Sequence, residues 1–175
     1  MSIARVIDTI NRMRADGVIP DYAIGGAVGA TFHLEPVSTL DVDIFVSFLV
    51  SPGSLLLSPQ PIFDYLCARG GRMQGEYVVI DGWPVQFLPP TGPLVEEALA
   101  EAITVPVGES SARVFTAEHL AAIALQVGRV KDKARLLQFI EAGILDSDRF
   151  QAILGRHDLY ETWQRFTRQF LSDPQ

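Results

Sequence analysis

The chain has 175 residues, of which 48% are hydrophobic and 20% are charged, and its formal net charge is −7 at pH 7. This length and composition predict one folded domain, or a core with an added lobe, and they exclude a disordered chain. The negative charge disfavours long nucleic acid as a partner, because binding to a phosphate backbone depends on cations. The sequence has no run of about 18 apolar residues, so we expect no membrane partner. With one cysteine, Cys67, no internal disulfide can form, and we expect a cytoplasmic protein.

Helical and strand patterns alternate along the first two-thirds of the chain. Apolar residues at helical spacing near the N-terminus stop at the turn signal Asp16-Gly17, and Gly25-Gly26 separates a short apolar strand from a small-residue helix. The pair Asp81-Gly82 predicts the turn of a hairpin. The expected helices are 3–15, about 27–34, 59–69 and 93–102, and the expected strands are 22–24, 41–50, 72–80, 84–88, 103–107 and 112–115.

The last third of the chain has helical periodicity throughout, beginning with an N-cap at Thr116. The expected helices are 117–127, 130–141, 146–154 and 158–171, separated at Gly128, Gly143 and Gly155. The whole pattern predicts an α/β (α+β) fold, with a mixed β-sheet core flanked by helices in residues 1–115 and a C-terminal helical lobe in residues 116–175. Three glutamates of the 93–102 helix are expected to form a solvated face: Glu96, Glu97 and Glu101.

Two glycines and two carboxylates stand out in the N-terminal part. Gly25 and Gly26 form a strand-to-helix turn, where backbone N–H groups can meet an anion such as phosphate. Asp41 and Asp43 are two residues apart on a hydrophobic strand, so their side chains share one face. Two adjacent carboxylates repel each other unless a cation lies between them. The sequence therefore predicts a phosphate and a cation in this region.

A glycine turn, a helix and then Asp-x-Asp on a strand resemble the signature of the nucleotidyltransferase superfamily, which is built like the polymerase-beta palm. The chain looks most like its small bacterial branch of AbiEii-type toxin-like proteins and minimal nucleotidyltransferases. The resemblance implies that Gly25, Gly26 and Thr39 contact a nucleoside triphosphate. It also implies that Asp41 and Asp43 hold Mg²⁺ against the triphosphate.

The same resemblance implies a third acidic residue on the second arm of the hairpin, and Gln86 stands at that position. Its carbonyl oxygen can reach a metal, but an amide cannot take up a proton near neutral pH. Gln86 is therefore a catalytic-site residue without the capacity of a general base. Glu76 on the opposing arm or Asp81 at the hairpin turn are alternative sources of a carboxylate.

The helical part contributes a basic cluster of Arg129, Lys131, Lys133 and Arg135. Arg129 and Lys131 are expected to contact the triphosphate, and the cluster could also bind an acidic acceptor. The alternative is a basic helix start on the surface. Related proteins often carry a lysine in the preceding helix, where residues 121–124 of this chain have none.

Two functions remain open. The first is a nucleotidyltransferase-like protein that binds Mg²⁺ and a nucleoside triphosphate and transfers a nucleotide to a small molecule, a protein or an RNA end. The second is an inactive binding or regulatory module with a protein partner, as in a toxin–antitoxin pair; Gln86, the missing helix lysine and Val37 in place of an arginine favour it. His119 and His157 lie far apart in sequence without zinc-ligand spacing, so no structural metal is expected there.

Overall fold

The structure is a computed structural model that describes residues 2–34, 41–48 and 58–171. Within these residues the chain forms eight helices and seven strands. The helices are α1 (Ile3–Ala15), α2 (Gly26–Thr31), α3 (Gln60–Cys67), α4 (Pro93–Ala100), α5 (Ala117–Val127), α6 (Val130–Glu141), α7 (Ser147–Arg156) and α8 (Tyr160–Phe170). The strands are β1 (Tyr22–Ile24), β2 (Val42–Val46), β3 (Arg72–Gln74), β4 (Tyr77–Ile80), β5 (Trp83–Leu88), β6 (Ile103–Val107) and β7 (Ser110–Val114).

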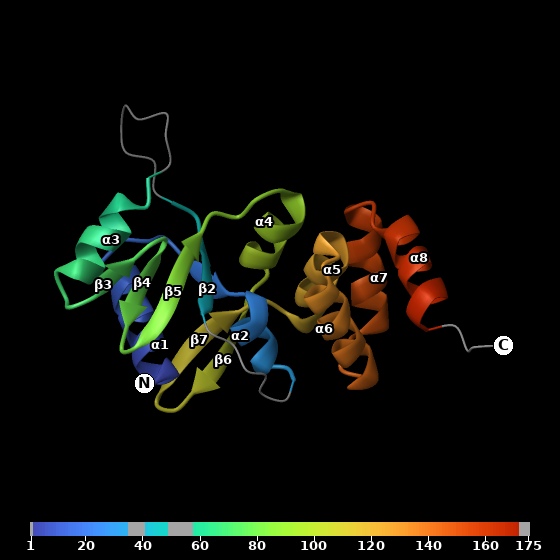
Figure 1. Ribbon diagram of the computed structural model, residues 1–175, viewed down its shortest axis with the longest axis horizontal. Helices are drawn as coiled ribbons and strands as arrows, with labels where there is room; N and C mark the ends of the chain where they lie inside the picture. The colour runs from blue at the N-terminus through green and yellow to red at the C-terminus, as the bar shows by residue number, and fades with distance from the viewer. Residues whose placement is uncertain (1, 35–40, 49–57, 172–175) are drawn as a thin grey trace.

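All seven strands belong to one mixed sheet with the order β3-β4-β5-β2-β1-β7-β6. The pairs β2–β5 and β1–β7 are parallel, and the other neighbouring pairs are antiparallel. The central strand is therefore β2, which lies between β5 and β1. Figure 1 shows helices α5–α8 together at one end of the molecule, beside the sheet. The mixed sheet with flanking helices confirms the predicted fold class.

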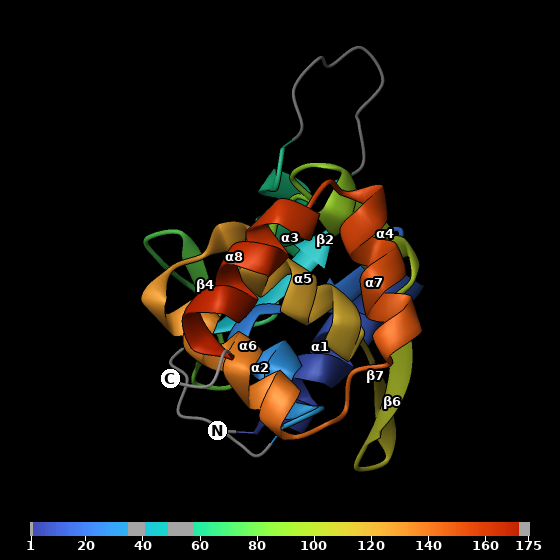
Figure 2. The ribbon, with the colours of Figure 1, turned by 90° about the vertical axis from the view of Figure 1, so that its right-hand side faces the viewer.

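Two hydrophobic clusters cover the two faces of the sheet. On one face, helices α1 and α3 pack on the strands through residues such as Ile10 and Leu66, which share a cluster with Ile44 of β2. On the other face, a second cluster runs from Phe115 through α4 and α5 into the remaining C-terminal helices. Figure 2, seen from the helical end, shows α5–α8 in front of the sheet. Apolar packing thus fixes the helical lobe against the core, while the division into domains after residue 115 stays a prediction.

Several element boundaries differ from the sequence prediction for local reasons. The predicted strand 41–50 ends at Val46, and the predicted strand 72–80 is divided into β3 and β4 by a turn at Gly75. Gly75 has a φ of 64°, a conformation that glycine adopts without strain. Gly155 does not end α7 but lies within it, where a Cβ would lie 3.2 Å from the ring of Tyr160. The hairpin turn at Asp81-Gly82 is confirmed, with both residues at positive φ.

Among the described residues, no helix combines the length and apolar character needed to span a bilayer.

We expect Phe139→Ala to lower the free energy of unfolding by about 3–5 kcal/mol, because Phe139 is fully buried between the C-terminal helices and its loss leaves a cavity. Val130→Ala on the same helix is the control. Val130 is 87% exposed, so its substitution should change stability by less than about 0.5 kcal/mol. Urea denaturation measures both, and equal losses would contradict the assigned core.

Candidate functional site

The central strand β2 separates an apolar face from a polar one. Val42, Ile44 and Val46 are buried in the cluster under α1 and α3. The alternate residue Asp43 points to the opposite face and is half-buried. Asp41 lies one residue before the strand and is also half-buried. Both predicted carboxylates therefore lie at the start of the same strand, on the side away from α1.

The parallel neighbour β5 places Gln86 directly beside Asp43. Paired residues of adjacent strands have their side chains on the same face of the sheet. Gln86 is half-buried there, whereas its neighbours Val85 and Phe87 are buried on the other face. The predicted third position is thus next to the acidic pair, and it carries an amide.

The glycine turn is pressed against this strand. The Gly25 N–H donates to the backbone carbonyl of Asp43 over 3.0 Å, so this N–H is part of the sheet. Gly26 has a φ of 57°, and a Cβ at this position would overlap the Asp43 carboxylate. A Cβ at Gly25 would lie 2.5 Å from the Phe45 ring. Glycine is therefore required at both positions to let α2 begin next to Asp43.

Gly26 and the polar residues of the sheet line a cleft of about 470 Å³ between the sheet and the helical lobe. Asp41, Asp43 and Gln86 form the sheet side of the cleft. The helical side carries basic residues from the start of α6: Arg129, Lys131 and Arg135. The structure thus brings the acidic pair, Gly26 and three of the four predicted basic residues together in one cavity. The fourth, Lys133, lies near the ring of Phe170 instead.

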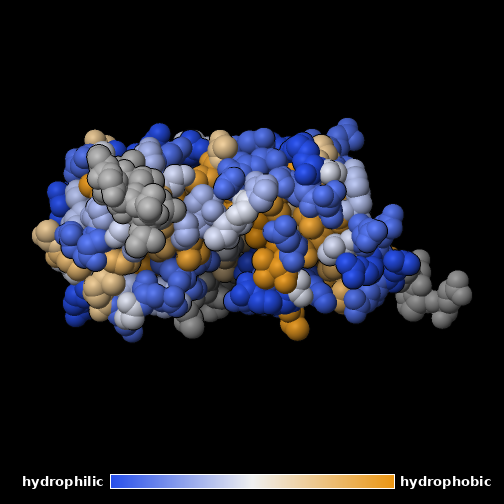
Figure 3. All heavy atoms as spheres, turned by 90° about the horizontal axis from the view of Figure 1, so that it is seen from above, coloured by the Kyte–Doolittle hydropathy of each residue, from blue (hydrophilic) through white to orange (hydrophobic). Residues whose placement is uncertain are grey.

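An apolar surface connects the two charged walls. Phe45 of β2 and Phe115 after β7 are in contact, with ring centroids 4.9 Å apart. Leu120, Ile123 and Val127 continue the surface along α5. This helix lacks a lysine at residues 121–124, and its apolar residues were not predicted to line the site. Figure 3 shows hydrophobic residues near the middle of one face, over the junction of the sheet with the helical lobe.

The electrostatics of Asp43 reflect both walls. Burial raises the pKa of Asp43 above its ordinary value, and the negative charge of Asp41 raises it further. The positive charges of Lys131, Arg135 and Arg129 act in the opposite direction. The basic residues of α6 are therefore close enough to Asp43 to influence its ionisation.

Arg129 has a local partner that the sequence argument missed. It is the N-cap of α6, and its Nε donates to Asp132 over 2.6 Å. The Asp132 carboxylate also accepts from the Arg129 backbone N–H. Lys131 and Arg135, one helical turn apart on α6, form no ion pair with another described residue.

The two alternative carboxylates lie elsewhere. Glu76 is exposed in the turn between β3 and β4, and not on a strand facing the site as the prediction required. Asp81 accepts from the backbone N–H of Ser2 and from Arg5, so it is held by the start of α1. Tyr77, which the sequence argument did not consider, lines the cleft. Thr39 and Val37 lie outside the described residues.

The donor set on the sheet side fits Mg²⁺. The carboxylates of Asp41 and Asp43 are hard oxygen ligands, and Gln86 adds an amide carbonyl at the neighbouring position. No histidine or cysteine lines this cleft among the described residues, so a softer metal has no matching ligands there.

No sequence family matches the chain, and no curated protein matches it in sequence. Solved structures do. A nucleotidyltransferase-like antigenic protein from Paracoccidioides brasiliensis matches with a TM-score of 0.59 and 16% identity, over 91% of this chain and 90% of that one. The chain has a nucleotidyltransferase-like fold.

Two structures of the antibiotic-resistance factor ANT(2'')-Ia share this nucleotidyltransferase-like fold. The solution structure matches with a TM-score of 0.53 and 14% identity, over 97% of this chain and all of the other. The crystal structure, a complex with adenylyl-2''-tobramycin, matches with a TM-score of 0.54 and 13% identity, over 92% of this chain and 97% of the other. The similarity spans both the sheet and the helical lobe, but these low identities support the fold alone. The resemblance to the AbiEii-type branch stays a prediction.

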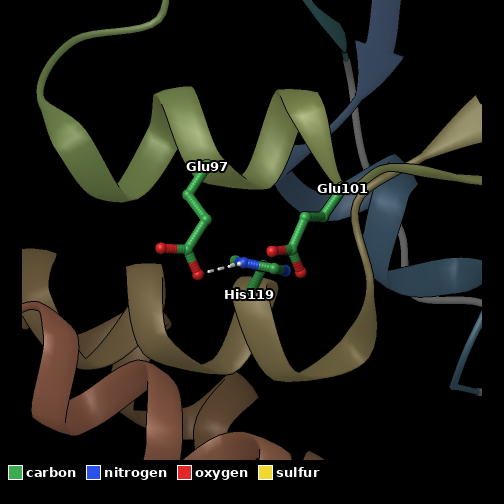
Figure 4. Close-up of side chains that lie close together, drawn as sticks. All are labelled: Glu97, Glu101 and His119. Atoms are coloured by element: carbon green, nitrogen blue, oxygen red, sulfur yellow. Dashed lines mark hydrogen bonds and ion pairs between the residues drawn. The ribbon is translucent and has the colours of Figure 1, made fainter.

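A second polar cluster joins helices of this nucleotidyltransferase-like fold outside the cleft. Glu97 of α4 accepts hydrogen bonds from Arg156 over 2.6 Å, from His157 over 2.7 Å and from His119 over 3.1 Å. Figure 4 shows His119 of α5 pointing between Glu97 of α4 and Glu101, the residue that follows α4. The prediction that Glu97 belongs to a solvated face is therefore wrong. Glu97 ties α4 to α5 and to the end of α7.

The ligand atoms of Glu97, Glu101 and His119 lie within 4.8 Å of one another, a spacing that could hold a metal ion. In the structure, however, both carboxylates already have cationic partners: Arg156 pairs with Glu97, and Arg149 pairs with Glu101. His119 is fully buried, and burial lowers its pKa despite the opposing effect of Glu97. We interpret the cluster as an ion-pair network that holds the helical lobe.

Glu97→Gln is expected to lower the free energy of unfolding at neutral pH. It should also make this free energy depend less on pH in the acidic range. Hydrogen bonds, first that of Arg156, lower the pKa of Glu97 from 4.5 to about 2 in the folded state. This stabilisation is complete above pH 4.5 and is lost as the pH falls toward 2, so the wild type loses stability over that interval. The glutamine variant lacks this titration.

Urea denaturation at several pH values measures the effect, with Glu96→Gln, an exposed neighbour on α4, as the matched control. Parallel acid profiles for the wild type and Glu97→Gln would contradict the assignment.

Proposed function

We propose that the cleft binds Mg²⁺ and a nucleoside triphosphate and transfers the nucleotidyl group to an acceptor. The observation that supports this most directly is the pairing of Asp43 with Gln86 opposite Lys131 and Arg135, within one cavity of about 470 Å³. Oxygen ligands for a divalent cation and basic groups for phosphates thus face each other. The nucleotidyltransferase-like fold supports the same reaction class.

In this proposal each part of the site has a separate task. Asp41 and Asp43 hold the cation, which when bound neutralises phosphate charge and orients the reacting oxygens. Gln86 offers a neutral oxygen beside them. Gly25 and Gly26 keep the start of α2 free of side chains, so that phosphates can approach the backbone near Asp43. Thr39 remains a predicted nucleotide contact.

The basic residues of α6 bind phosphate oxygens. Lys131 and Arg135 have no ion-pair partner among the described residues, and their charges reach Asp43 across the cleft. Arg129 contributes its charge while Asp132 fixes its side chain. Charged hydrogen bonds of this type are stronger than neutral ones and suit phosphates.

The acceptor class is open to a small molecule, a protein or an RNA end. The crystal structure of ANT(2'')-Ia holds adenylyl-2''-tobramycin, a nucleotidylated small molecule, and we favour a small-molecule acceptor here by analogy. A role within the AbiEii-type branch would add a protein partner. A triphosphate substrate also agrees with the expected cytoplasmic location.

Asp43→Asn should weaken binding of Mg²⁺–ATP or another Mg²⁺–nucleoside triphosphate by at least about tenfold, because the isosteric amide removes a charged ligand of the cation. Isothermal titration with each nucleoside triphosphate measures the affinity, and omission of Mg²⁺ should have a comparable effect.

Asp148→Asn, an exposed carboxylate on α7, removes the same charge outside the cleft and should bind like the wild type. If the wild type binds no nucleoside triphosphate in the presence of Mg²⁺, the proposed function is wrong. Nucleotide binding without transfer to any acceptor would favour the inactive module.

Gly26→Ala should abolish nucleotide binding, because its Cβ would displace the Asp43 carboxylate. Gly143→Ala is a matched control, since Gly143 also has a positive φ of 63° but open space around its Cβ position. Both variants should lose about 1–3 kcal/mol of stability from backbone strain. Titration of the folded variants with the nucleotide separates this shared loss of stability from the effect on binding. Equal nucleotide affinities of the two variants would contradict the role assigned to Gly26.

A further inference from the structure

The position beside the acidic pair cannot take a proton from an acceptor. Gln86 pairs in register with Asp43 and lies on the same face of the sheet. An amide offers a carbonyl oxygen to a cation but stays neutral and unprotonated near pH 7. A hydroxyl acceptor attacks efficiently only when a base removes its proton during the reaction.

The other described residues of the cleft do not replace this base. Asp41 and Asp43 hold the cation in the proposed function, and both carboxylate oxygens of Asp132 are engaged by Arg129. Tyr77 also lines the cleft, but a phenol, with an ordinary pKa of about 10, is protonated at neutral pH and cannot act as the base.

The three histidines of the chain are held elsewhere. His33 Nε2 lies 2.8 Å from the carbonyl oxygen of Phe115. His119 and His157 both contact Glu97, outside the cleft. No imidazole is therefore placed to act on an acceptor in the cleft.

The helical wall suits an anion. Lys131 and Arg135 lie one turn apart on α6 and carry charges without an ion-pair partner among the described residues. Leu120, Ile123 and Val127 line the same cleft and provide an apolar surface. A ligand with an ionised group and an apolar body complements both features.

We propose that the acceptor is an oxyanion that is already ionised at neutral pH, either a carboxylate or a phosphate monoester. This inference rests on the proposed nucleotidyl transfer. The acceptor oxygen forms a bond to the α-phosphorus while the bond from that phosphorus to the bridging oxygen breaks. Pyrophosphate leaves with the electron pair, and no proton has to be removed. The product is a mixed anhydride.

The test uses the wild-type protein, Mg²⁺, a nucleoside triphosphate that it binds, labelled at the α-phosphate, and three aromatic acceptors: benzoate, phenyl phosphate and benzyl alcohol. Label should move to benzoate or phenyl phosphate with release of pyrophosphate, and at least about tenfold more slowly to benzyl alcohol. Preferred transfer to the alcohol, or no transfer to either anion, overturns the inference. Failure to bind the nucleotide would instead overturn the proposed function.

Gln86→Glu tests the missing base directly. It should raise transfer to benzyl alcohol by at least about tenfold, whereas Gln86→Ala should not. Glu35 is the one carboxylate in the segment 35–40, which lies outside the described residues. Glu35→Gln should leave transfer to the anions unchanged. If this variant loses transfer to the anions, Glu35 acts as a base and the inference is overturned.

A binding measurement tests the cationic wall without catalysis. With Mg²⁺ and a non-hydrolysable nucleotide analogue at a concentration that saturates each variant, replacing both Lys131 and Arg135 by glutamine should weaken benzoate binding by about tenfold. Replacing Arg165 and Arg168, two exposed arginines of α8, removes the same total charge and should have no effect. Equal affinities of the wild type and the first variant would overturn the assignment.

Discussion

Repulsion between two half-buried carboxylates at the start of the central strand is the constraint on which the site depends. Asp41 and Asp43 lie two residues apart, and burial with mutual repulsion raises the pKa of Asp43. On the opposite wall, the positive charges of Lys131 and Arg135 lower the pKa of Asp43. The strand can keep this pair because its other face is anchored by buried aliphatic residues. Sheet and helical lobe are therefore electrostatically complementary before any ligand binds.

Features with local causes were predictable from the sequence. The glycine turn, the alternation that puts Asp41 and Asp43 on one face, and the Thr116 cap of α5 each depend on neighbouring residues. The position of Gln86 followed from a family resemblance, and the parallel pairing of β2 with β5 gives it a structural basis. Basic residues at the start of α6 reached the cleft as expected.

Features that depend on distant contacts were not predictable. Glu97 meets His119 and His157 from 22 and 60 residues away, and nothing in a helical charge pattern indicates such partners. The apolar wall from α5 depends on the packing of α5 beside the sheet, which brings Leu120, Ile123 and Val127 to the cleft. Glu76 was misplaced for another reason: its strand is interrupted one residue earlier, at Gly75, where positive φ reverses the chain.

The hydrogen bonds of Glu97 have a consequence for the energetics of the cleft. Helix α4 follows β5, which carries Gln86, and Glu97 binds it to the bundle that carries Lys131 and Arg135. A side chain outside the cavity thereby fixes the separation of its two walls. A link of this kind limits relative movement of the two walls, and this would lower the conformational entropy lost when a ligand binds between them. Selection on Glu97 would act on affinity through geometry, without any contact with the ligand.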